Sequence, residues 1–275
     1  KKLSVFCGPN GTGKTYLAKQ IAKQIIGIDS DEELSNSGQF GFVQFHPSYD
    51  YTDFVEGLRP TKPDANGNIG FELKNGVFKE FCIEAKKHNG LEHSKNYVFV
   101  IDEINRGEIS KIFGELFFSI DPSYRGIKGA VKTQYANMHE DSNETFYIPE
   151  NMYIIGSMND IDRSVESFDF AMRRRFTWIE ITAEESTVNM NLPKEIVDKM
   201  QSLNQEISDI EGLGNSFHIG GAYFLDADGN PRTDLDKVYQ FRIEPLLKEY
   251  LRGLSEAENT LKSLKEKFFS DENNR

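Results

Sequence analysis

The residues best suited to chemistry lie near the start of the chain, in the stretch GPNGTGKT at 8–15. Its spacing is G-x-x-x-x-G-K-[ST], in which glycines turn backbone N–H groups onto phosphate oxygens and the next helix presents its positive N-terminus. In such a loop the lysine reaches the outer phosphates and the hydroxyl residue ligates Mg²⁺. The stretch therefore predicts a nucleotide-binding loop with a magnesium ligand at its end. Its members are Gly8, Pro9, Asn10, Gly11, Thr12, Gly13, Lys14 and the metal ligand Thr15.

Two acids, Asp102 and Glu103, follow the unbroken apolar run YVFVI at 97–101. Such a run is typical of a buried parallel strand. In a nucleotide hydrolase the first acid of such a pair holds Mg²⁺ through water, and the second polarises the attacking water as general base. An acid pair at a strand end is also common without any catalytic role. Because the phosphate loop precedes this pair, we interpret Asp102 as a metal-site residue and Glu103 as the catalytic base.

Asn159 ends a second apolar strand, in the stretch MYIIGSMN at 152–159. An uncharged amide beside the phosphates can orient the attacking water, or hold the γ-phosphate without repelling it. We predict this catalytic role for Asn159. The same residue type at a strand end is also a frequent turn former, so the residue alone leaves both interpretations open.

Three adjacent arginines at 173–175 follow a short predicted helix. In an acidic protein such a cluster can be a solvated face or can anchor neighbouring acids. A sharper interpretation is an arginine finger, which stabilises charge on the transferring phosphoryl group and is often supplied by a neighbouring subunit. We therefore predict that Arg174 and Arg175 are catalytic residues, and that the chain forms a ring or another oligomer.

Strands and helices alternate around these motifs. Residues 60–76, rich in Pro, Gly, Asn and Asp, predict an inserted loop or hairpin, and the polar residues 121–145 predict a hairpin or a mobile loop. The alternation indicates an α/β fold with a parallel sheet flanked by helices, whose ligands bind at the carboxyl ends of the strands. Apolar runs and helical spacing predict strands at 3–8, 40–48, 96–103 and 152–159 and helices at 14–26, 77–88 and 108–121. A short helix, the arginine cluster and a last strand are predicted within 168–181.

Near residue 183 the pattern becomes helical. Further helices are predicted at 236–254 and 258–269. We therefore predict two domains, an α/β nucleotide-binding domain over 1–182 and a smaller, mostly helical lid domain over 183–275. Residues 193–210 of the lid carry one apolar helical stripe, made of Ile196, Met200, Leu203, Ile207 and Ile210.

Composition and charge limit the class of protein. A formal charge of −12 argues against broad nucleic-acid binding by this segment, because phosphate contacts need clustered Lys and Arg. A local basic strip inside an oligomer's pore stays open. Cys7 and Cys82 are too few for a disulfide framework, which favours a reducing cytoplasm. The sequence has no apolar run long enough to span a membrane, so we expect a soluble chain with no membrane partner.

Two further features bear on what accompanies this segment. The chain opens directly on a strand without a Met, which we interpret as a fragment of a longer protein whose N-terminal module is missing. Its five histidines share no metal-ligand spacing, so we predict no metal site beyond Mg²⁺. We expect His218 to be a structural or interdomain residue.

The order of these motifs, with a helical lid after them, resembles an AAA+ ATPase module. Longer stretches narrow the resemblance to the McrB family, which supplies the nucleotide-hydrolysing motor subunit of modification-dependent restriction systems. Those stretches are FVQFHPSYDYTDFVEGLRP (42–60), VFVIDEINRGEISKIFGELFFSID (98–121) and MYIIGSMNDIDRSVESFDFAMRRRF (152–176). Together they cover most of the predicted nucleotide-binding domain.

Two shorter stretches are also similar to family motifs. MNDIDRS corresponds to the family's Met-Asn-x-x-Asp signature, so the resemblance implies that Asn159 and Asp162 belong to the nucleotide site. FHIGGAYF at 217–224 resembles the family's Gly-His-Ser-Tyr-Phe lid stretch only in part, because Gly221 and Ala222 replace its His and Ser.

The resemblance also implies ligands and partners. Members of the family prefer GTP to ATP, assemble as hexamers and are stimulated by a partner subunit, McrC, which carries the nuclease. DNA in that family is recognised by a separate N-terminal domain. This chain is accordingly expected to bind GTP and Mg²⁺, and to drive DNA translocation coupled to cleavage by an McrC-like subunit in a cytoplasmic phage-defence system.

Two other functions remain as alternatives at this point. One is an ATP-using remodelling or chaperone-type AAA+ module, and the other is a nucleotide-gated scaffold whose output is oligomerisation. The preference for GTP rests on the resemblance alone, since no residue pattern identifies the base-binding contacts. Nor does the sequence say which modified DNA is the target.

Overall fold

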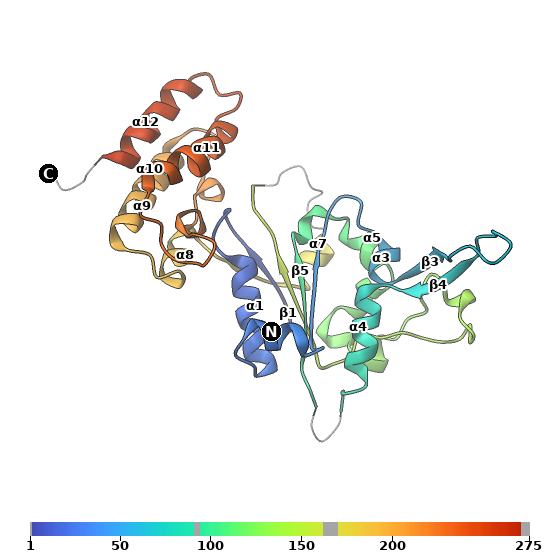
Figure 1. Ribbon diagram of the computed structural model, residues 1–275. Coiled ribbons are helices and arrows are strands. Elements are labelled where there is room, and N and C mark those ends of the chain that lie inside the picture. The colour runs from blue at the N-terminus through green and yellow to red at the C-terminus, as the bar shows by residue number, and fades with distance from the viewer. Residues whose placement is uncertain (1, 91–93, 162–169, 271–275) are drawn as a thin grey trace. The chain divides into compact units, whose positions relative to one another are not determined.

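A five-stranded sheet carries the predicted motifs, in a computed structural model that describes residues 2–90, 94–161 and 170–270 (Figure 1). Within these residues the strand order is β2-β5-β6-β1-β7, and the pairs β1–β6, β2–β5 and β5–β6 are parallel. Parallel neighbours need long crossover connections, which helices provide here. The bounds are β1 Leu3–Cys7, β2 Phe40–Gln44, β5 Tyr97–Asp102, β6 Met152–Ser157 and β7 Thr177–Glu180.

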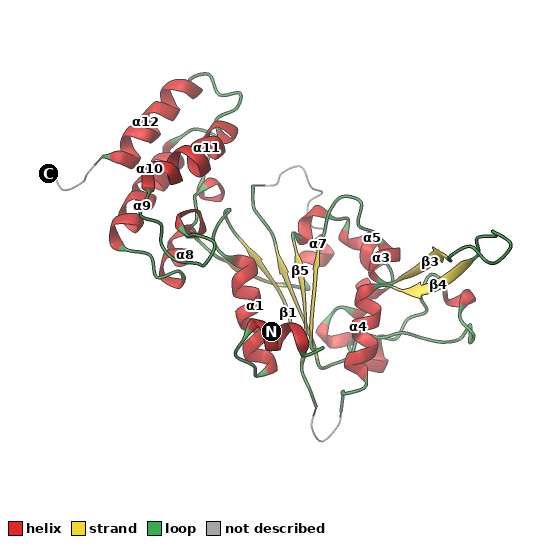
Figure 2. Cartoon of the chain, in the orientation of Figure 1, coloured by secondary structure: helices red, strands yellow, loops and turns green. Residues whose placement is uncertain are grey.

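Helices cover both faces of this sheet, with α1 on one side and α3, α4 and α5 on the other (Figure 2). The first of them, α1, ends before Gly27, whose φ of 85° only glycine adopts freely, as the sequence predicts. The predicted α/β fold is confirmed. The bounds are α1 Lys14–Ile26, α2 Asp31–Asn36, α3 Tyr51–Phe54, α4 Val77–Lys86, η1 Ile104–Arg106, α5 Ile109–Phe113, α6 Leu116–Ser119 and α7 Phe170–Arg173.

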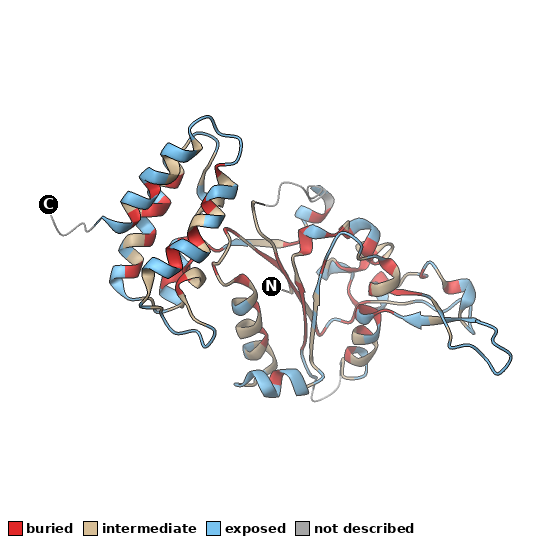
Figure 3. Cartoon of the chain, turned by 45° about the horizontal axis from the view of Figure 1, so that its top comes forward, coloured by how far each residue is buried: buried red, intermediate tan, exposed pale blue. Residues whose placement is uncertain are grey.

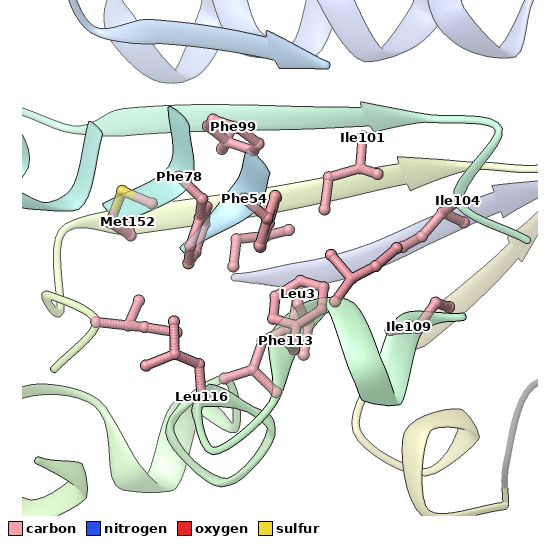
Figure 4. Close-up of a cluster of buried hydrophobic side chains, with 14 of the residues drawn as sticks. Leu3, Phe54, Phe78, Phe99, Ile101, Ile104, Ile109, Phe113, Leu116 and Met152 are labelled. Atoms are coloured by element: carbon pink, nitrogen blue, oxygen red, sulfur yellow. The ribbon is translucent and has the colours of Figure 1, made fainter. Parts of the chain in front are cut away.

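The core beside the sheet is aromatic. Phe54 lies 4.6 Å from Phe78 and 4.7 Å from Phe113 between ring centroids, and Phe99 of β5 lies at 5.9 Å (Figure 4). All four rings are at most 1% exposed. Aromatic pairs of this kind contribute about 0.5–1.5 kcal/mol beyond the area that they bury. Buried residues follow the strands and the inner sides of the helices (Figure 3), so this core holds α3, α4 and α5 against the sheet.

The predicted insertion at 60–76 is an antiparallel hairpin, made of β3 (Glu56–Pro60) and β4 (Phe71–Asn75). Its base is anchored by a buried ion pair between Glu56 and Lys79, and the Nε2 atom of His139 lies 2.9 Å from the same carboxylate. Burial alone would raise the pKa of Glu56, but these partners hold it below its ordinary value. The carboxylate of Glu56 is therefore ionised. Lys79 and His139 supply the partners that a buried charge requires.

The helix predicted at 108–121 is wrong in one respect, because two short helices, α5 and α6, replace it. Gly114 separates them with φ 50° and ψ −129°, outside helical geometry. A Cβ at Gly114 would lie 2.8 Å from the Tyr51 ring, so the break lets the chain pack closely against α3. Short 3₁₀ helices and one antiparallel bridge, Val131 to Phe146, follow in the predicted hairpin or loop region. They are η2 Pro122–Tyr124, η3 Gly126–Gly129 and η4 Ala136–Met138.

The C-terminal part of the chain is helical, as predicted. The α9 residues Ile196, Met200, Leu203 and Ile207 are at most 4% exposed, which confirms the apolar stripe over these four residues. The fifth predicted member, Ile210, is half-buried and lies just beyond the end of α9 in extended backbone. The helix predicted at 236–254 contains a π segment, η7. The bounds are α8 Ala183–Asn189, α9 Lys194–Asp209, η5 Asn215–Phe217, η6 Gly221–Phe224, α10 Leu235–Val238, η7 Tyr239–Ile243, α11 Glu244–Tyr250 and α12 Ala257–Phe269.

His218 has a structural place within this helical part. Its Nε2 atom lies 2.7 Å from the hydroxyl of Ser208, on α9. Burial lowers the pKa of His218 below its ordinary value, so the ring is neutral near pH 7. The histidine thus fastens the segment after η5 to α9.

The described residues form two compact units that do not follow the sequence order. The first unit contains the described residues of 1–6, 15–158 and 163–179, and the second those of 7–14, 159–162 and 180–275. The phosphate-loop stretch therefore clusters with the helical part of the chain. Across the described residues, every helix is too short or too polar to span a membrane.

Candidate nucleotide-binding site

The loop between β1 and α1 has the backbone that its glycines allow. Gly8, Gly11 and Gly13 have φ values of 141°, 77° and 79°, which side-chain-bearing residues rarely adopt. At Gly8 a Cβ would also lie 2.3 Å from the carbonyl oxygen of Ile181. Because α1 begins at Lys14, this glycine-rich turn leads directly into a helix N-terminus, where phosphate groups bind well.

Lys14 lies inside the loop and is only 6% exposed. Its ammonium group donates hydrogen bonds to the carbonyl oxygens of Gly8, at 3.0 Å, and Pro9, at 2.7 Å. The Thr12 hydroxyl is 3.4 Å from the same nitrogen. A buried cation needs such partners, and these oxygens hold the charge of Lys14 where the loop turns.

Cys7, at the end of β1, does not supply nucleophilic chemistry to this site. Burial raises its pKa to about 11, and the carboxylates of Asp160 and Glu180 add to the rise. The group is therefore a neutral thiol at pH 7, whereas the thiolate is the reactive form.

Thr15, Asp102 and Ser157 form a cluster of oxygen atoms in the first unit. The Thr15 hydroxyl donates a 2.7 Å hydrogen bond to Oδ1 of Asp102, and the Ser157 hydroxyl donates to the same oxygen. The register explains the second contact, because Ile101 of β5 lies opposite Gly156 of β6, one residue before the acid and the serine. The carboxyl ends of two neighbouring strands thus bring these side chains together.

These oxygen atoms suit Mg²⁺, which prefers oxygen ligands. The ion usually binds one or two protein groups and completes its coordination with waters and phosphate oxygens. Thr15 and Asp102, the two residues predicted to bind the metal, lie in hydrogen-bond contact. The described residues contain no group of three or more His, Cys, Asp or Glu side chains that could hold an ion. A magnesium site completed by phosphate oxygens does not require one.

Glu103 stands at the turn after β5 in a left-handed conformation, with φ 50° and ψ 43°. For a residue other than glycine this conformation costs about 1–2 kcal/mol, and such strain is concentrated at functional sites. The carboxylate is 16% exposed and accepts a 3.1 Å hydrogen bond from Nε of Arg106. The structure therefore gives the predicted base a fixed position and a cationic neighbour.

Asn159 follows β6 and lies in the second unit, with the phosphate loop. The next residue, Asp160, donates its backbone N–H to the carbonyl oxygen of Gly8 at 3.3 Å, so this segment contacts the first glycine of the loop. Asn159 itself is half-buried. Asp162 lies outside the described residues.

The three arginines differ in their surroundings. The Arg173 guanidinium lies 5.2 Å from the Trp178 ring, and that of Arg175 lies 4.5 Å from the Phe117 ring. Arg173 and Arg174 are exposed, whereas Arg175 is half-buried. Stacking on a ring face is a common arrangement for a guanidinium, and it gives Arg175 a fixed position while Arg174 faces solvent.

The stretch FHIGGAYF contacts the phosphate loop directly. Gly220 donates its N–H to the carbonyl of Asn10 at 3.0 Å, and Ala222 donates to the carbonyl of Gly11 at 2.9 Å. A Cβ at Gly221 would lie 2.9 Å from side-chain atoms of Leu192 and Met190, so a larger residue would displace them.

Sequence reasoning missed three of these features. Ser157 could have been found by aligning the ends of the two apolar strands, and Arg106 by its spacing of three residues from Glu103. The contact between the lid stretch and the phosphate loop has one sequence signal, the adjacent glycines at 220 and 221, which permit a close backbone approach.

Comparison with known proteins places the chain in a family. Residues 4–176 match the AAA domain of the dynein-related subfamily. Residues 195–258 match the McrB alpha-helical lid domain. This chain belongs to the AAA family. It combines an McrB-like AAA domain with an McrB lid, which confirms the predicted P-loop AAA+ fold and the resemblance on which it rested. It is thus a P-loop NTPase module, whose family binds nucleotide, usually with Mg²⁺.

Two bacterial proteins are similar over much of this AAA module. The Type IV methyl-directed restriction enzyme EcoKMcrB subunit of Escherichia coli (strain K12) is 39% identical over 266 residues, which are 91% of this chain and 54% of that protein. The Type II restriction enzyme BsuMI component YdiS of Bacillus subtilis (strain 168) is 26% identical over 208 residues, 66% of this chain and 57% of that protein. The chain therefore spans somewhat more than half the length of each.

Proposed function

We propose that this chain is the NTP-hydrolysing AAA+ motor module of a modification-dependent DNA restriction complex, with GTP as its nucleotide. The observation that carries the proposal is the 2.7 Å contact between the Thr15 hydroxyl and the Asp102 carboxylate, which joins the end of the phosphate loop to the acid of β5. Membership of the AAA family supports the hydrolytic part. Similarity to two restriction-enzyme subunits supports the wider role.

The loop at 8–15 binds the triphosphate. Its positive-φ glycines direct backbone N–H groups at the phosphate oxygens, and the N-terminus of α1 favours their negative charge. Lys14 exchanges the carbonyl oxygens of Gly8 and Pro9 for β- and γ-phosphate oxygens. The exchange is favourable because phosphate oxygens carry negative charge, so attraction between opposite charges replaces hydrogen bonds to neutral carbonyls.

Thr15 and Asp102 would hold Mg²⁺, which would supply positive charge to neutralise the phosphates. Ser157 contributes by donating to Oδ1 of Asp102, which fixes the carboxylate plane.

Glu103 takes the proton from the attacking water. Its backbone is left-handed at the turn after β5, and Arg106 donates a hydrogen bond to one of its carboxylate oxygens. A base in a fixed place contributes roughly 10²–10⁴-fold to the rate. Asn159 orients the water or the γ-phosphate, and Asp162 belongs to the same nucleotide site.

An arginine from a neighbouring subunit completes the site. Arg174, one of the two exposed members of the cluster, reaches across the subunit boundary, and Arg175 acts beside it from its place on Phe117. A site shared in this way requires a homo-oligomer, and we propose a hexameric ring.

Similarity to restriction-enzyme components supports a wider assembly. We propose that an McrC-like nuclease subunit binds this ring, and that DNA reaches it through the assembly or through a separate N-terminal domain. The net charge of −12 fits a motor that leaves sequence recognition to another domain. The proposed location is the cytoplasm, and the proposed domain limits remain 1–182 and 183–275.

The decisive test is steady-state phosphate release by the purified chain with Mg²⁺ and either GTP or ATP, with and without a candidate nuclease subunit. GTP turnover that the nuclease subunit stimulates is the expected result. Faster turnover of ATP would favour an ATP-dependent remodelling module instead. Nucleotide-dependent assembly with negligible turnover of both would favour a scaffold.

A further inference from the structure

The outer side of the phosphate loop is packed by residues from much later in the chain. At three of its glycines, an added Cβ would lie between 2.3 and 2.8 Å from an atom of the second unit, closer than real Cβ contacts allow. Backbone, an aromatic ring and a thioether side chain supply these contacts. They join Gly8 to Ile181, Gly11 to Tyr223 and Gly13 to Met190.

Two backbone hydrogen bonds attach the lid to the centre of this loop. Gly220 donates to the carbonyl of Asn10 at 3.0 Å, and Ala222 donates to the carbonyl of Gly11 at 2.9 Å. In a planar trans peptide the N–H points opposite to the C=O. When the lid holds these two carbonyls, it therefore turns the N–H groups of Gly11 and Thr12 to the opposite side, where a loop of this type binds phosphate.

A glycine is needed at position 220 because the lid backbone lies so close to the loop backbone. Its φ of −84° could be adopted by any residue. A Cβ there would lie 2.3 Å from the carbonyl carbon of Gly11 and 2.5 Å from the backbone nitrogen of Thr12. Both atoms belong to the loop backbone, which cannot move aside as a flexible side chain can. The lid and the loop are in contact at this point with no room for a side chain.

The ring of Tyr223 packs against the phosphate loop at the same place. Two carbons of its ring would lie 2.7 Å from a Cβ on Gly11, and burial raises the pKa of its hydroxyl. Arg242 holds the lid stretch from the other side, because its Nη1 atom donates to the carbonyls of Tyr223, at 3.2 Å, and Leu225, at 2.9 Å. These side chains border a cavity of about 390 Å³ that is lined by Asn10, Gly11, Ala222, Tyr223 and Arg242.

We propose that the lid stretch Gly220–Tyr223 is a positioning element for nucleotide hydrolysis, with Tyr223 as its positioning residue. It sets the orientation of the Asn10–Gly11 and Gly11–Thr12 peptides, and therefore the phosphate-binding N–H groups, through backbone contacts. The proposal rests on the proposed NTPase function and adds a means by which the lid controls it. Because coupling between two sites is reciprocal, nucleotide binding must also stabilise the contact between the lid stretch and the loop.

The test compares four variants of the full chain with the wild type. Tyr223→Ala removes the ring from Gly11, whereas Tyr223→Phe keeps it and removes only the hydroxyl. Gly220→Ala places a methyl group against the loop backbone. Gly214→Ala is the matched control, since a Cβ at that glycine has open space around it. Each protein is assayed for GTP turnover, for the Kd of GDP with Mg²⁺, and for the thermal midpoint without nucleotide.

We expect Tyr223→Ala to raise the Kd of GDP and the KM for GTP about tenfold, as the loss of one or two well-aligned hydrogen bonds would. Gly220→Ala should show a larger loss, while Tyr223→Phe and Gly214→Ala stay within about twofold of the wild type. The thermal midpoint of Tyr223→Ala without nucleotide should change little.

Three results would overturn the proposal. They are an unchanged Kd and KM in Tyr223→Ala, an equal loss in Tyr223→Phe, or a lower thermal midpoint with normal nucleotide affinity. Failure of the proposed NTPase function looks different, because the wild type would then bind GDP without turning over GTP or ATP. The Kd values would still decide whether the lid stretch positions the loop.

Discussion

The two compact units hold their parts of the candidate site by different means. In the first unit, side chains hold the site residues in place, since the hydroxyls of Thr15 and Ser157 both donate to the Asp102 carboxylate. In the second unit, the backbone holds the phosphate loop in place. Two lid N–H groups donate hydrogen bonds to loop carbonyls, and glycines occupy the points of closest approach. Side-chain chemistry is visible in residue types, whereas backbone chemistry depends on where distant segments meet. Substitutions should therefore affect catalysis in the first unit and nucleotide affinity in the second.

The largest expected effect tests whether a neighbouring subunit supplies an arginine to the part of the candidate site that the first unit holds. Arg174→Ala should lower GTP turnover about 10³-fold or more, because a finger arginine contributes on that scale. Arg173→Ala, an exposed neighbour beside Trp178, is the control. Equal amounts of Arg174→Ala and Lys14→Ala proteins should regain about a quarter of the wild-type rate, since each active site needs one intact loop and one intact finger. No recovery at any ratio, with assembly verified by size, would contradict a shared site.

The next effect separates catalysis from binding within the first unit. Glu103→Gln should lower turnover roughly 10²–10⁴-fold, as removal of a general base does, with the Kd of GTP nearly unchanged. Glu108→Gln is a suitable control, because that acid lies on the connection after β5 and pairs with Lys111. Near-normal turnover in Glu103→Gln would remove this residue as the base.

A stability measurement tests the aromatic core beside the sheet of the first unit. Phe54→Ala should lower the free energy of unfolding by about 3–5 kcal/mol, the usual cost of a large cavity among buried rings. Phe71→Ala on the hairpin, where the ring is 69% exposed, should cost less than about 0.5 kcal/mol. Denaturant unfolding of both variants makes the comparison, and similar losses would argue against this description of the core.

A smaller effect is expected where one hydroxyl only orients the metal-site acid. Ser157→Ala should lower turnover about tenfold and raise the Mg²⁺ concentration needed for half-maximal rate, because it removes a hydrogen bond to a charged group. Ser110→Ala, an exposed serine on α5, should leave both unchanged. A normal magnesium dependence in Ser157→Ala would mean that Thr15 alone suffices to orient Asp102.

The smallest effect concerns the helical unit and its response to acid. Because burial lowers the pKa of His218 below its ordinary value of 6.5, the unfolded chain binds more protons than the folded one in mildly acid solution. The histidine's contribution to stability is therefore complete above pH 6.5 and is lost as the pH falls below it. Between pH 7.5 and 5.5 the loss should be about 1 kcal/mol or less. His218→Gln should unfold with a smaller pH dependence, and an unchanged one would exclude this source.

Several elements could be predicted from sequence because their causes are local. The spacing of glycines, lysine and threonine in GPNGTGKT predicts a turn into a helix, and the structure has both. The buried run before Asp102 and the apolar stripe of α9 are also as predicted, since burial periodicity follows from backbone geometry. The helix predicted at 108–121 was wrong because Gly114 makes a tertiary contact with Tyr51 that no local pattern shows.

Residue types and their spacing were enough to predict a phosphate loop, an acid pair and a helical lid, and the resemblance of longer stretches predicted the AAA+ family that the comparisons show. The partners of those residues came only from tertiary structure. Ser157 reaches Asp102 because β6 is the neighbour of β5, and Tyr223 reaches Gly11 because the chain returns to its own beginning some two hundred residues later. Both contacts depend on strand order and chain return, which arise from burial of the whole core rather than from any short segment.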